Sequence, residues 1–204
     1  MTTFEKKIRR WSEVLCLTLF LFLPFNLSPL TANPYHADSV LLDAYRREDM
    51  SVWKEHIDKK IDLLYEYGFC GYMVDRDKNH ALPYVQKFKS HILSQKSQLP
   101  AGHYEMYMSA VYVYELRLKE SIHPVKAMSL AKEATRLAPN DPLVLSYYGT
   151  CLFYAPKPFG SKSEALKWFE QAHTLFQSPQ WKYCWVREAN DMYIRQCHEK
   201  LEKP

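Results

Sequence analysis

Eight histidines are the side chains of this sequence with the widest chemical range, because imidazole binds metal ions and exchanges protons near neutral pH. A helical metal site needs two ligands on one helix face, as in the pattern His-Glu-x-x-His. The sequence contains no such pair, and the run from Glu55 to Asp58 places its charges on different helix faces. We therefore expect surface or helix-capping histidines and no metal site at His36, His56, His80, His91, His103, His123, His173 and His198.

Catalytic nucleophiles and phosphate-binding loops leave recognisable patterns, and none occurs in this chain. The sequence lacks a Gly-x-Ser-x-Gly turn, a glycine-rich phosphate loop and a Cys-x-x-Cys pair. Asp75 and Asp77 are close in sequence, but they belong to the charged run 75–79, which predicts a solvated turn. The sequence therefore predicts a protein that is not an enzyme and that carries no cofactor.

Aromatic residues are concentrated in two segments that are predicted to be helical. Four tyrosines lie between His103 and Lys119, and four further aromatic residues lie between Pro142 and Tyr154. Tyrosine combines a large apolar ring with a hydroxyl group and is enriched where proteins bind partners. We therefore expect these aromatic residues to bind a partner, and the packing of the helices decides which rings are exposed for binding.

Small and apolar residues recur at helical spacing from Pro124 to Ala172 and define the helices around these rings. Offsets of three and four place them on one face of each helix. They are Ala127, Leu130, Ala131, Ala134, Leu137 and Ala138, then Leu145, Tyr148, Gly149 and Leu152, then Ala165, Phe169 and Ala172. The segments thus repeat one helix-packing pattern.

This pattern resembles the tetratricopeptide repeat (TPR), a 34-residue pair of antiparallel helices in which small residues allow close approach. The second-helix positions of one repeat are matched by Ala127, Ala131, Ala134 and Pro139. The first-helix positions of the next repeat follow without a shift at Leu145, Tyr148, Gly149 and Leu152. The chain departs from the pattern at Ala131, where an aromatic residue is usual, at Gln177, where proline is usual, and in its longer loops. The loop 156–160, with the sequence Pro-x-x-Phe-Gly, is similar to a segment of small bacterial TPR-like proteins that carry signal peptides.

The resemblance implies an all-α fold, namely a TPR-like superhelix of antiparallel helical hairpins with terminal capping helices. The low glycine count of 5 also favours helices over an all-β fold. Residues 33–204 are predicted to form a single domain with units at about 51–98, 102–139 and 142–177 and a capping helix at 179–201.

Several helix ends are predicted from the capping and turn residues. In the first unit we expect one helix from Ser51 toward Gly68 or Gly71, and a second helix capped by Asn79 with Pro83 in its first turn. The last helix is expected to start at Ser178 and Pro179. Further helix caps are predicted at Asp38, Asp141 and Ser161.

The repeat register places seven residues near the concave side, where TPR proteins commonly hold a peptide. They are Tyr104, Tyr107, Tyr114, Leu143, Tyr147, Phe153 and Tyr154. The resemblance thus implies a non-catalytic scaffold that binds a protein or peptide partner on these residues. Two alternatives stay open: the long loops bury these rings, or the loops at 119–123 and 155–160 close a pocket for a small or extended apolar ligand.

The charge of the chain is too evenly balanced to indicate nucleic-acid binding. The formal net charge is +4, to which four basic and two acidic side chains before residue 33 contribute half. The rest of the chain has 23 basic and 21 acidic side chains, whereas binding a phosphate backbone needs a concentrated basic patch. No nucleic-acid partner is expected.

Residues 1–32 have the layout of a secretory signal peptide. A basic region ends at Arg10, an apolar run extends from Val14 to Leu23, and a proline-containing segment follows. The run is shorter than the roughly twenty residues of a membrane-spanning helix, although reading on to Leu30 lengthens it. We interpret the chain as an exported protein of the bacterial periplasm or cell envelope, with an uncleaved membrane anchor as the alternative.

Four cysteines remain beyond this segment, which is an even number in an exported protein. If one helix contains both Cys184 and Cys197, about 19 Å of rise separates them and they cannot pair with each other. We expect buried free thiols, with disulfides as the alternative, at Cys70, Cys151, Cys184 and Cys197.

Overall fold

The structure is a computed structural model that describes residues 38–120, 123–156 and 158–201. The predicted signal segment at 1–32 and part of the predicted loop 119–123 lie outside these residues. Export and the alternative of a membrane anchor therefore stay predictions. Among the described helices, none has both the length and the apolar character needed to cross a membrane.

Every regular element in the described residues is a helix, which confirms the predicted all-α class. The α-helices are α2 (Ser39–Arg46), α3 (Met50–Lys59), α4 (Leu63–Arg76), α5 (Lys78–Gln95), α6 (His103–Arg117), α7 (Pro124–Leu137), α8 (Pro142–Tyr154), α9 (Lys162–Phe176) and α10 (Trp185–Leu201). Two short 3-10 helices, η1 (Lys96–Gln98) and η2 (Pro179–Trp181), follow α5 and precede α10.

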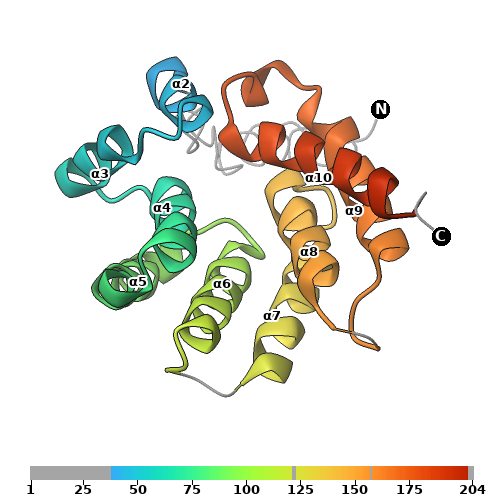
Figure 1. Ribbon diagram of the computed structural model, residues 1–204, viewed down its shortest axis with the longest axis horizontal. Coiled ribbons are helices and arrows are strands. Elements are labelled where there is room, and N and C mark those ends of the chain that lie inside the picture. Colours follow the sequence, from blue (N-terminus) through green and yellow to red (C-terminus); the bar gives the residue numbers. More distant parts are fainter. Residues whose placement is uncertain (1–37, 121–122, 157, 202–204) are drawn as a thin grey trace, which may run out of the picture. The chain divides into compact units, whose positions relative to one another are not determined.

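Helices that follow one another in the chain pack as hairpins: α4 with α5, α6 with α7, and α8 with α9. Figure 1 shows these pairs in chain order, with α10 lying against α8 and α9. Helix α6 also contacts α4 and α8, so the first helices of the three hairpins meet one another. The aromatic-rich helices α6 and α8 are therefore central to the packing.

Three of the predicted helix caps are confirmed. The Asp38 carboxylate accepts a hydrogen bond from the backbone N–H of Val40 at 2.8 Å. The Asp141 carboxylate accepts from two free N–H groups at the start of α8, and the Ser161 hydroxyl accepts from the N–H of Glu164 at 3.3 Å. These side chains satisfy backbone donors that have no partner within the helix.

The single helix predicted from Ser51 toward Gly68 or Gly71 is wrong. Helix α3 ends at Lys59, an extended backbone follows, and α4 begins at Leu63. The rings of Trp53 and Tyr65 pack edge to face at 5.0 Å. Twelve residues of continuous helix would separate these two positions by about 18 Å, so this contact requires the break.

The cap predicted at Asn79 is also wrong, because α4 extends to Arg76 and α5 begins at Lys78. Asp77 occupies the cap position, where its carbonyl accepts from the N–H of His80 at 3.1 Å. Pro83 consequently lies inside α5, beyond its first turn.

The last helix starts later than its predicted start at Ser178 and Pro179. The N–H of Trp181 bonds to the Ser178 carbonyl, and the N–H of Cys184 bonds to the Trp181 carbonyl. These i to i+3 bonds form a 3-10 turn, so α10 begins only at Trp185 and Cys184 precedes it.

A small residue sets the spacing of the third hairpin. A methyl group at Gly149 of α8 would lie 2.7 Å from a ring carbon of Phe169, which belongs to α9 and is fully buried. The missing side chain thus creates the space into which the phenylalanine ring packs, as expected where a small residue lets two helices approach closely.

A second small residue connects the two ends of the described chain. A methyl group at Gly68 of α4 would overlap the rings of both Trp53, from α3, and Trp185, from α10. The two tryptophan rings lie 5.3 Å apart, and Arg46 of α2 pairs with Glu188 of α10 at 2.5 Å. Helices from the beginning and the end of the described chain therefore meet over α4.

Replacing Gly149 with alanine should destabilise the protein by about 1–3 kcal/mol, because the added methyl group overpacks a ring that has no free space. Glycine-to-alanine changes inside helices normally stabilise by up to about 1 kcal/mol, so the predicted sign is reversed. Urea unfolding followed by circular dichroism measures the difference. Ser129→Ala, at an exposed position of α7, is the control, and a stabilised Gly149→Ala protein would contradict the packing at this position.

Candidate functional site

The seven predicted partner-binding residues do not form one exposed surface. Five of them are buried, namely Tyr107, Tyr114, Leu143, Tyr147 and Phe153. Tyr104 is partly buried, whereas Tyr154 has 67% of its surface exposed. Of these seven residues, only Tyr154, the last residue of α8, offers a partner a largely free aromatic ring.

The buried tyrosines Tyr107, Tyr114 and Tyr147 pack against a ring of another helix, α4. Tyr67 of α4 lies with its ring centre within 6.5 Å of those of Tyr107, Tyr114 and Tyr147. It also lies 5.8 Å from the ring of Trp185, which fixes it from the side of α10. The predicted concave aromatics are thus part of the core between α4, α6 and α8.

Their hydroxyl groups find partners inside the protein, as buried polar groups require. The Tyr147 hydroxyl lies 2.8 Å from the Ser109 hydroxyl, and Ser109 donates to the carbonyl of Ala127 at 2.7 Å. The Tyr114 hydroxyl donates to the carbonyl of Tyr67 at 2.9 Å. Burial raises the pKa values of Tyr114 and Tyr147 well above that of a free tyrosine.

Tyr104 belongs to a different surface from Tyr154. It lies under the ammonium group of Lys96, 4.4 Å from the ring centre. Tyr112, two turns further along α6, lies under Lys126 of α7 at 4.6 Å. Both tyrosines are partly buried and pack under lysines of neighbouring segments.

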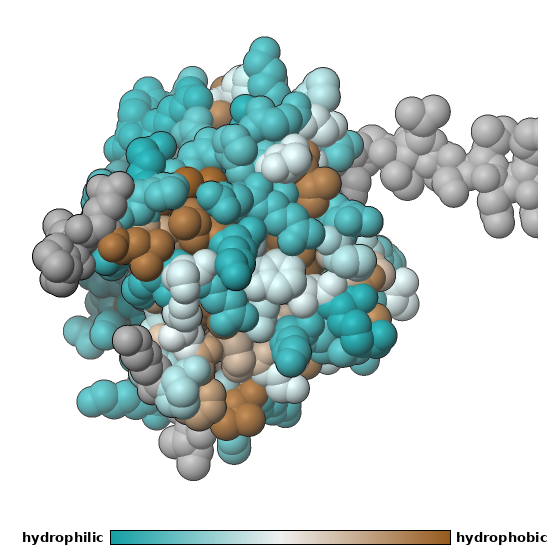
Figure 2. Space-filling view, turned by 90° about the vertical axis from the view of Figure 1, so that its right-hand side faces the viewer, coloured by the Kyte–Doolittle hydropathy of each residue, from teal (hydrophilic) through white to brown (hydrophobic). Residues whose placement is uncertain are grey.

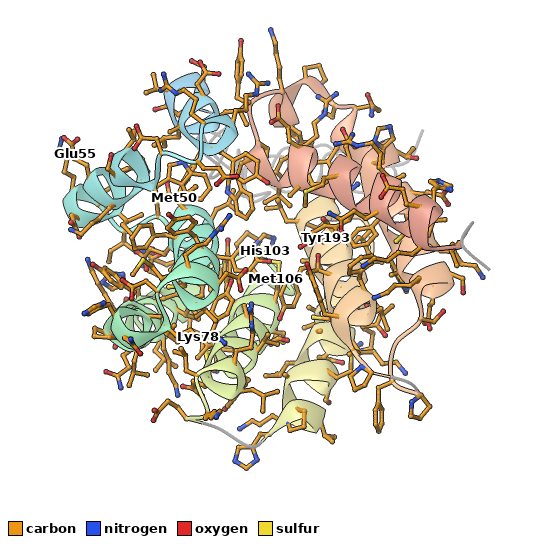
Figure 3. All side chains as sticks on the ribbon, viewed as in Figure 1. Met50, Glu55, Lys78, His103, Met106 and Tyr193 are labelled. Carbon is orange, nitrogen blue, oxygen red and sulfur yellow. The ribbon has the colours of Figure 1, made fainter. Side chains whose placement is uncertain are left out.

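Tyr154 is part of an aromatic group at the end of α8. Its ring packs against those of Phe153 at 5.1 Å and Tyr193 of α10 at 6.0 Å. Tyr193 also stacks on Phe169 at 5.2 Å, and Figure 3 labels it where α10 passes α8. The following loop, whose Gly160 lies close to the carbonyls of Leu152 and Ala155, also carries Phe159, which is 65% exposed.

Two lysines complete this part of the surface. The ammonium group of Lys162, the first residue of α9, lies 3.8 Å from the ring centre of Phe153. That of Lys200, in the last turn of α10, lies 4.5 Å from the same ring centre. We call the group of Phe153, Tyr154, Phe159, Lys162, Tyr193 and Lys200 the aromatic–lysine corner.

Sequence reasoning identified only Phe153 and Tyr154 of this corner. The other members come from α9, α10 and the loop before α9, so they become neighbours only after folding. One signal was present, because Tyr193 and Lys200 are seven residues apart and therefore lie on one helix face.

The histidines mostly pair with carboxylates, and four of these pairs connect separate helices or helix ends. The buried His103 at the start of α6 lies 2.9 Å from the Asp141 carboxylate at the start of α8. Comparable pairs are His56 with Asp62, His80 with Asp77, His91 with Glu66, and His173 with Asp191. Within the described residues, no group of three histidine, cysteine or acidic side chains is arranged to hold a metal ion.

The cysteines Cys70, Cys151, Cys184 and Cys197 are free thiols in the structure. Cys151 is partly accessible, yet burial raises the pKa of its thiol to about 11. The other three are buried, which agrees with the expectation of packed free thiols.

The described residues line surface pockets that are open to solvent, two of which lie at the starts of α9 and α7. One, of about 530 Å³, is lined by α9 and its cap between Ser161 and Gln171. The other, of about 480 Å³, is lined by residues of the start of α7 between His123 and Ser129.

The comparisons with known proteins identify no relative. No protein-family model, no curated protein and no solved structure matches this chain significantly.

Removing the Tyr147 hydroxyl should cost about 1 kcal/mol of unfolding free energy, because a buried hydrogen bond to Ser109 is lost. Tyr147→Phe tests this with little change of shape, and urea unfolding measures it. The Tyr154 hydroxyl belongs to an exposed residue, and its distance of 3.4 Å from the Tyr193 hydroxyl makes for a weak hydrogen bond. Tyr154→Phe should therefore change the free energy of unfolding by much less. Equal effects of the two substitutions would contradict the internal role of Tyr147.

The protein should lose stability when the pH rises above about 10, the pKa of an exposed tyrosine. Burial raises the folded-state pKa values of Tyr67, Tyr114, Tyr147 and Tyr193, so folding favours their protonated forms. This contribution is complete below the unfolded-state pKa and is lost as the pH rises toward the folded-state values. Phenolate absorbance should therefore increase together with the loss of helical circular dichroism, and full ionisation of a still helical protein would contradict the burial.

Proposed function

We propose that the chain is a non-catalytic, TPR-like interaction module that binds a protein or peptide partner at the aromatic–lysine corner. Successive helical hairpins support the TPR-like part of the proposal, as does the packing of Gly149 against Phe169. The register of small residues from Ala127 to Ala172 is the sequence feature behind it.

The main support for placing the binding site at this corner is the exposure of two large aromatic residues that are close together in the chain. Tyr154 is 67% exposed and Phe159 is 65% exposed, whereas the other aromatic residues of α8 are buried. Large aromatic residues at a surface gain free energy when a partner covers them. Figure 2 shows the side that includes α9: hydrophobic residues appear there as separate patches within a mainly hydrophilic surface, which suits a small contact site.

The proposed place of action is the bacterial periplasm or cell envelope. This part rests on the layout of residues 1–32, which resembles a signal peptide. The proposal includes no nucleic-acid partner, because residues 33–204 carry nearly equal numbers of basic and acidic side chains.

Affinity recovery from a bacterial envelope extract tests the proposal with the variant Tyr154→Ala/Phe159→Ala. Proteins that the unchanged protein recovers should be lost or reduced about tenfold with this variant, since removing aromatic anchors typically costs more than about 1 kcal/mol each. Circular dichroism must first show that the variant keeps its helices.

The matched control is Leu93→Ala/Val125→Ala, which removes two other exposed apolar side chains on α5 and α7. It should recover the same proteins as the unchanged protein. Equal recovery by the corner variant and the control would show that no partner uses the corner.

A further inference from the structure

The two lysines of the corner point at one ring from two different helices. Lys162 comes from the start of α9 and Lys200 from the end of α10, and both ammonium groups lie within 4.5 Å of the centre of the Phe153 ring. The ring itself is only 1% exposed, so the lysine stems help to cover it. Two positive charges are thus concentrated beside the exposed ring of Tyr154.

Neither ammonium group has an acidic partner among the ion pairs of the described residues. The π face of Phe153 is the favourable electrostatic contact that the structure gives them. Other lysines of the described chain do find carboxylates, for example Lys54 with Asp58 and Lys89 with Glu115. The corner therefore has positive charge that its own residues do not neutralise.

Lys162 is the less favourably placed of the two lysines. It is the first residue of α9, where the helix dipole is positive and disfavours a further positive charge. Burial lowers the pKa of its ammonium group, and the nearby charge of Lys200 lowers it further. A negatively charged group brought to this point would relieve both effects.

We propose that the aromatic–lysine corner binds a partner segment in which a carboxylate side chain stands next to an apolar or aromatic residue. The carboxylate would lie between the ammonium groups of Lys162 and Lys200, and the apolar residue would pack on Tyr154 and Phe159. This inference rests on the proposed function, because it names the chemical character of the partner at the same site.

A peptide segment fits the corner better than an anionic membrane surface does. Lys162 is partly buried and its ammonium group lies 3.8 Å from the centre of the buried Phe153 ring, whereas Lys200, Tyr154 and Phe159 are exposed. A flat layer of lipid headgroups meets the most exposed groups first, whereas a single side chain of a peptide can enter a recess. The charge and the apolar surface therefore suit alternating acidic and apolar residues of one chain.

Fluorescence anisotropy with two labelled synthetic peptides tests the inference on the full chain. The acidic peptide is Gly-Ser-Asp-Phe-Glu-Leu-Ser-Gly, and the neutral peptide has Asn and Gln in place of Asp and Glu. We expect the unchanged protein to bind the acidic peptide about tenfold more tightly, since charge-assisted hydrogen bonds contribute roughly that factor or more. The difference should decrease with added salt.

The variant Lys162→Met/Lys200→Met keeps the unbranched stems that cover Phe153 and removes both charges. It should bind the two peptides equally. The control Lys132→Met/Lys167→Met removes the same net charge from exposed positions on α7 and α9 and should keep the preference. Loss of the preference in both variants, or no preference in the unchanged protein, would overturn the inference.

Sedimentation with vesicles of phosphatidylserine and phosphatidylcholine examines the membrane alternative. Binding to these vesicles that depends on Lys162 and Lys200, without binding of the acidic peptide, would also overturn the inference.

The envelope recovery with Tyr154→Ala/Phe159→Ala is independent of charge. If that recovery still depends on the two rings while the acidic peptide fails to bind, the inference fails and the proposed function stands.

Discussion

The packing over Gly68 is the constraint on which the other features of the described chain depend. Because this residue has no side chain, the rings of Trp53 and Trp185 can both lie against α4. Trp185 brings α10 to this point, and the pairing of Arg46 with Glu188 joins α2 to α10 beside it. Contacts between residues more than one hundred positions apart thus fix the two ends of the described chain to its first hairpin.

This constraint also decides what happens to the tyrosines of α6 and α8. Tyr67 precedes Gly68 in α4 and lies against Trp185, which holds its ring over Tyr107, Tyr114 and Tyr147. Rings that an open array of hairpins would present to a peptide are therefore core residues with internal hydrogen bonds. The free energy gained by burying them adds to the stability of the fold and is not available for binding a partner.

The sequence predicted the features that local chemistry controls. The caps at Asp38, Asp141 and Ser161 depend on a side chain and its own helix, and they were found. The break between α3 and α4 was missed because a long-range contact, that of Trp53 with Tyr65, requires it. The same reason explains why Tyr154 was predicted but Lys162 and Lys200 were not: helical spacing identifies residues on one helix, whereas the corner combines residues of α8, α9, α10 and the loop between α8 and α9.

The loop after α8 explains why the corner stays exposed while neighbouring rings are buried. A side chain at Gly160 would overlap the backbone carbonyls of Leu152 and Ala155, so the loop folds closely onto the end of α8. The carbonyl of Pro156 accepts hydrogen bonds from the N–H groups of both Phe159 and Gly160, at 2.9 and 3.2 Å. With the backbone held inward in this way, Phe159 keeps its ring in solvent. A ring that is presented by an already ordered backbone loses less conformational entropy when it binds, because little remains to be ordered. The enlarged loop therefore acts as a support for the corner.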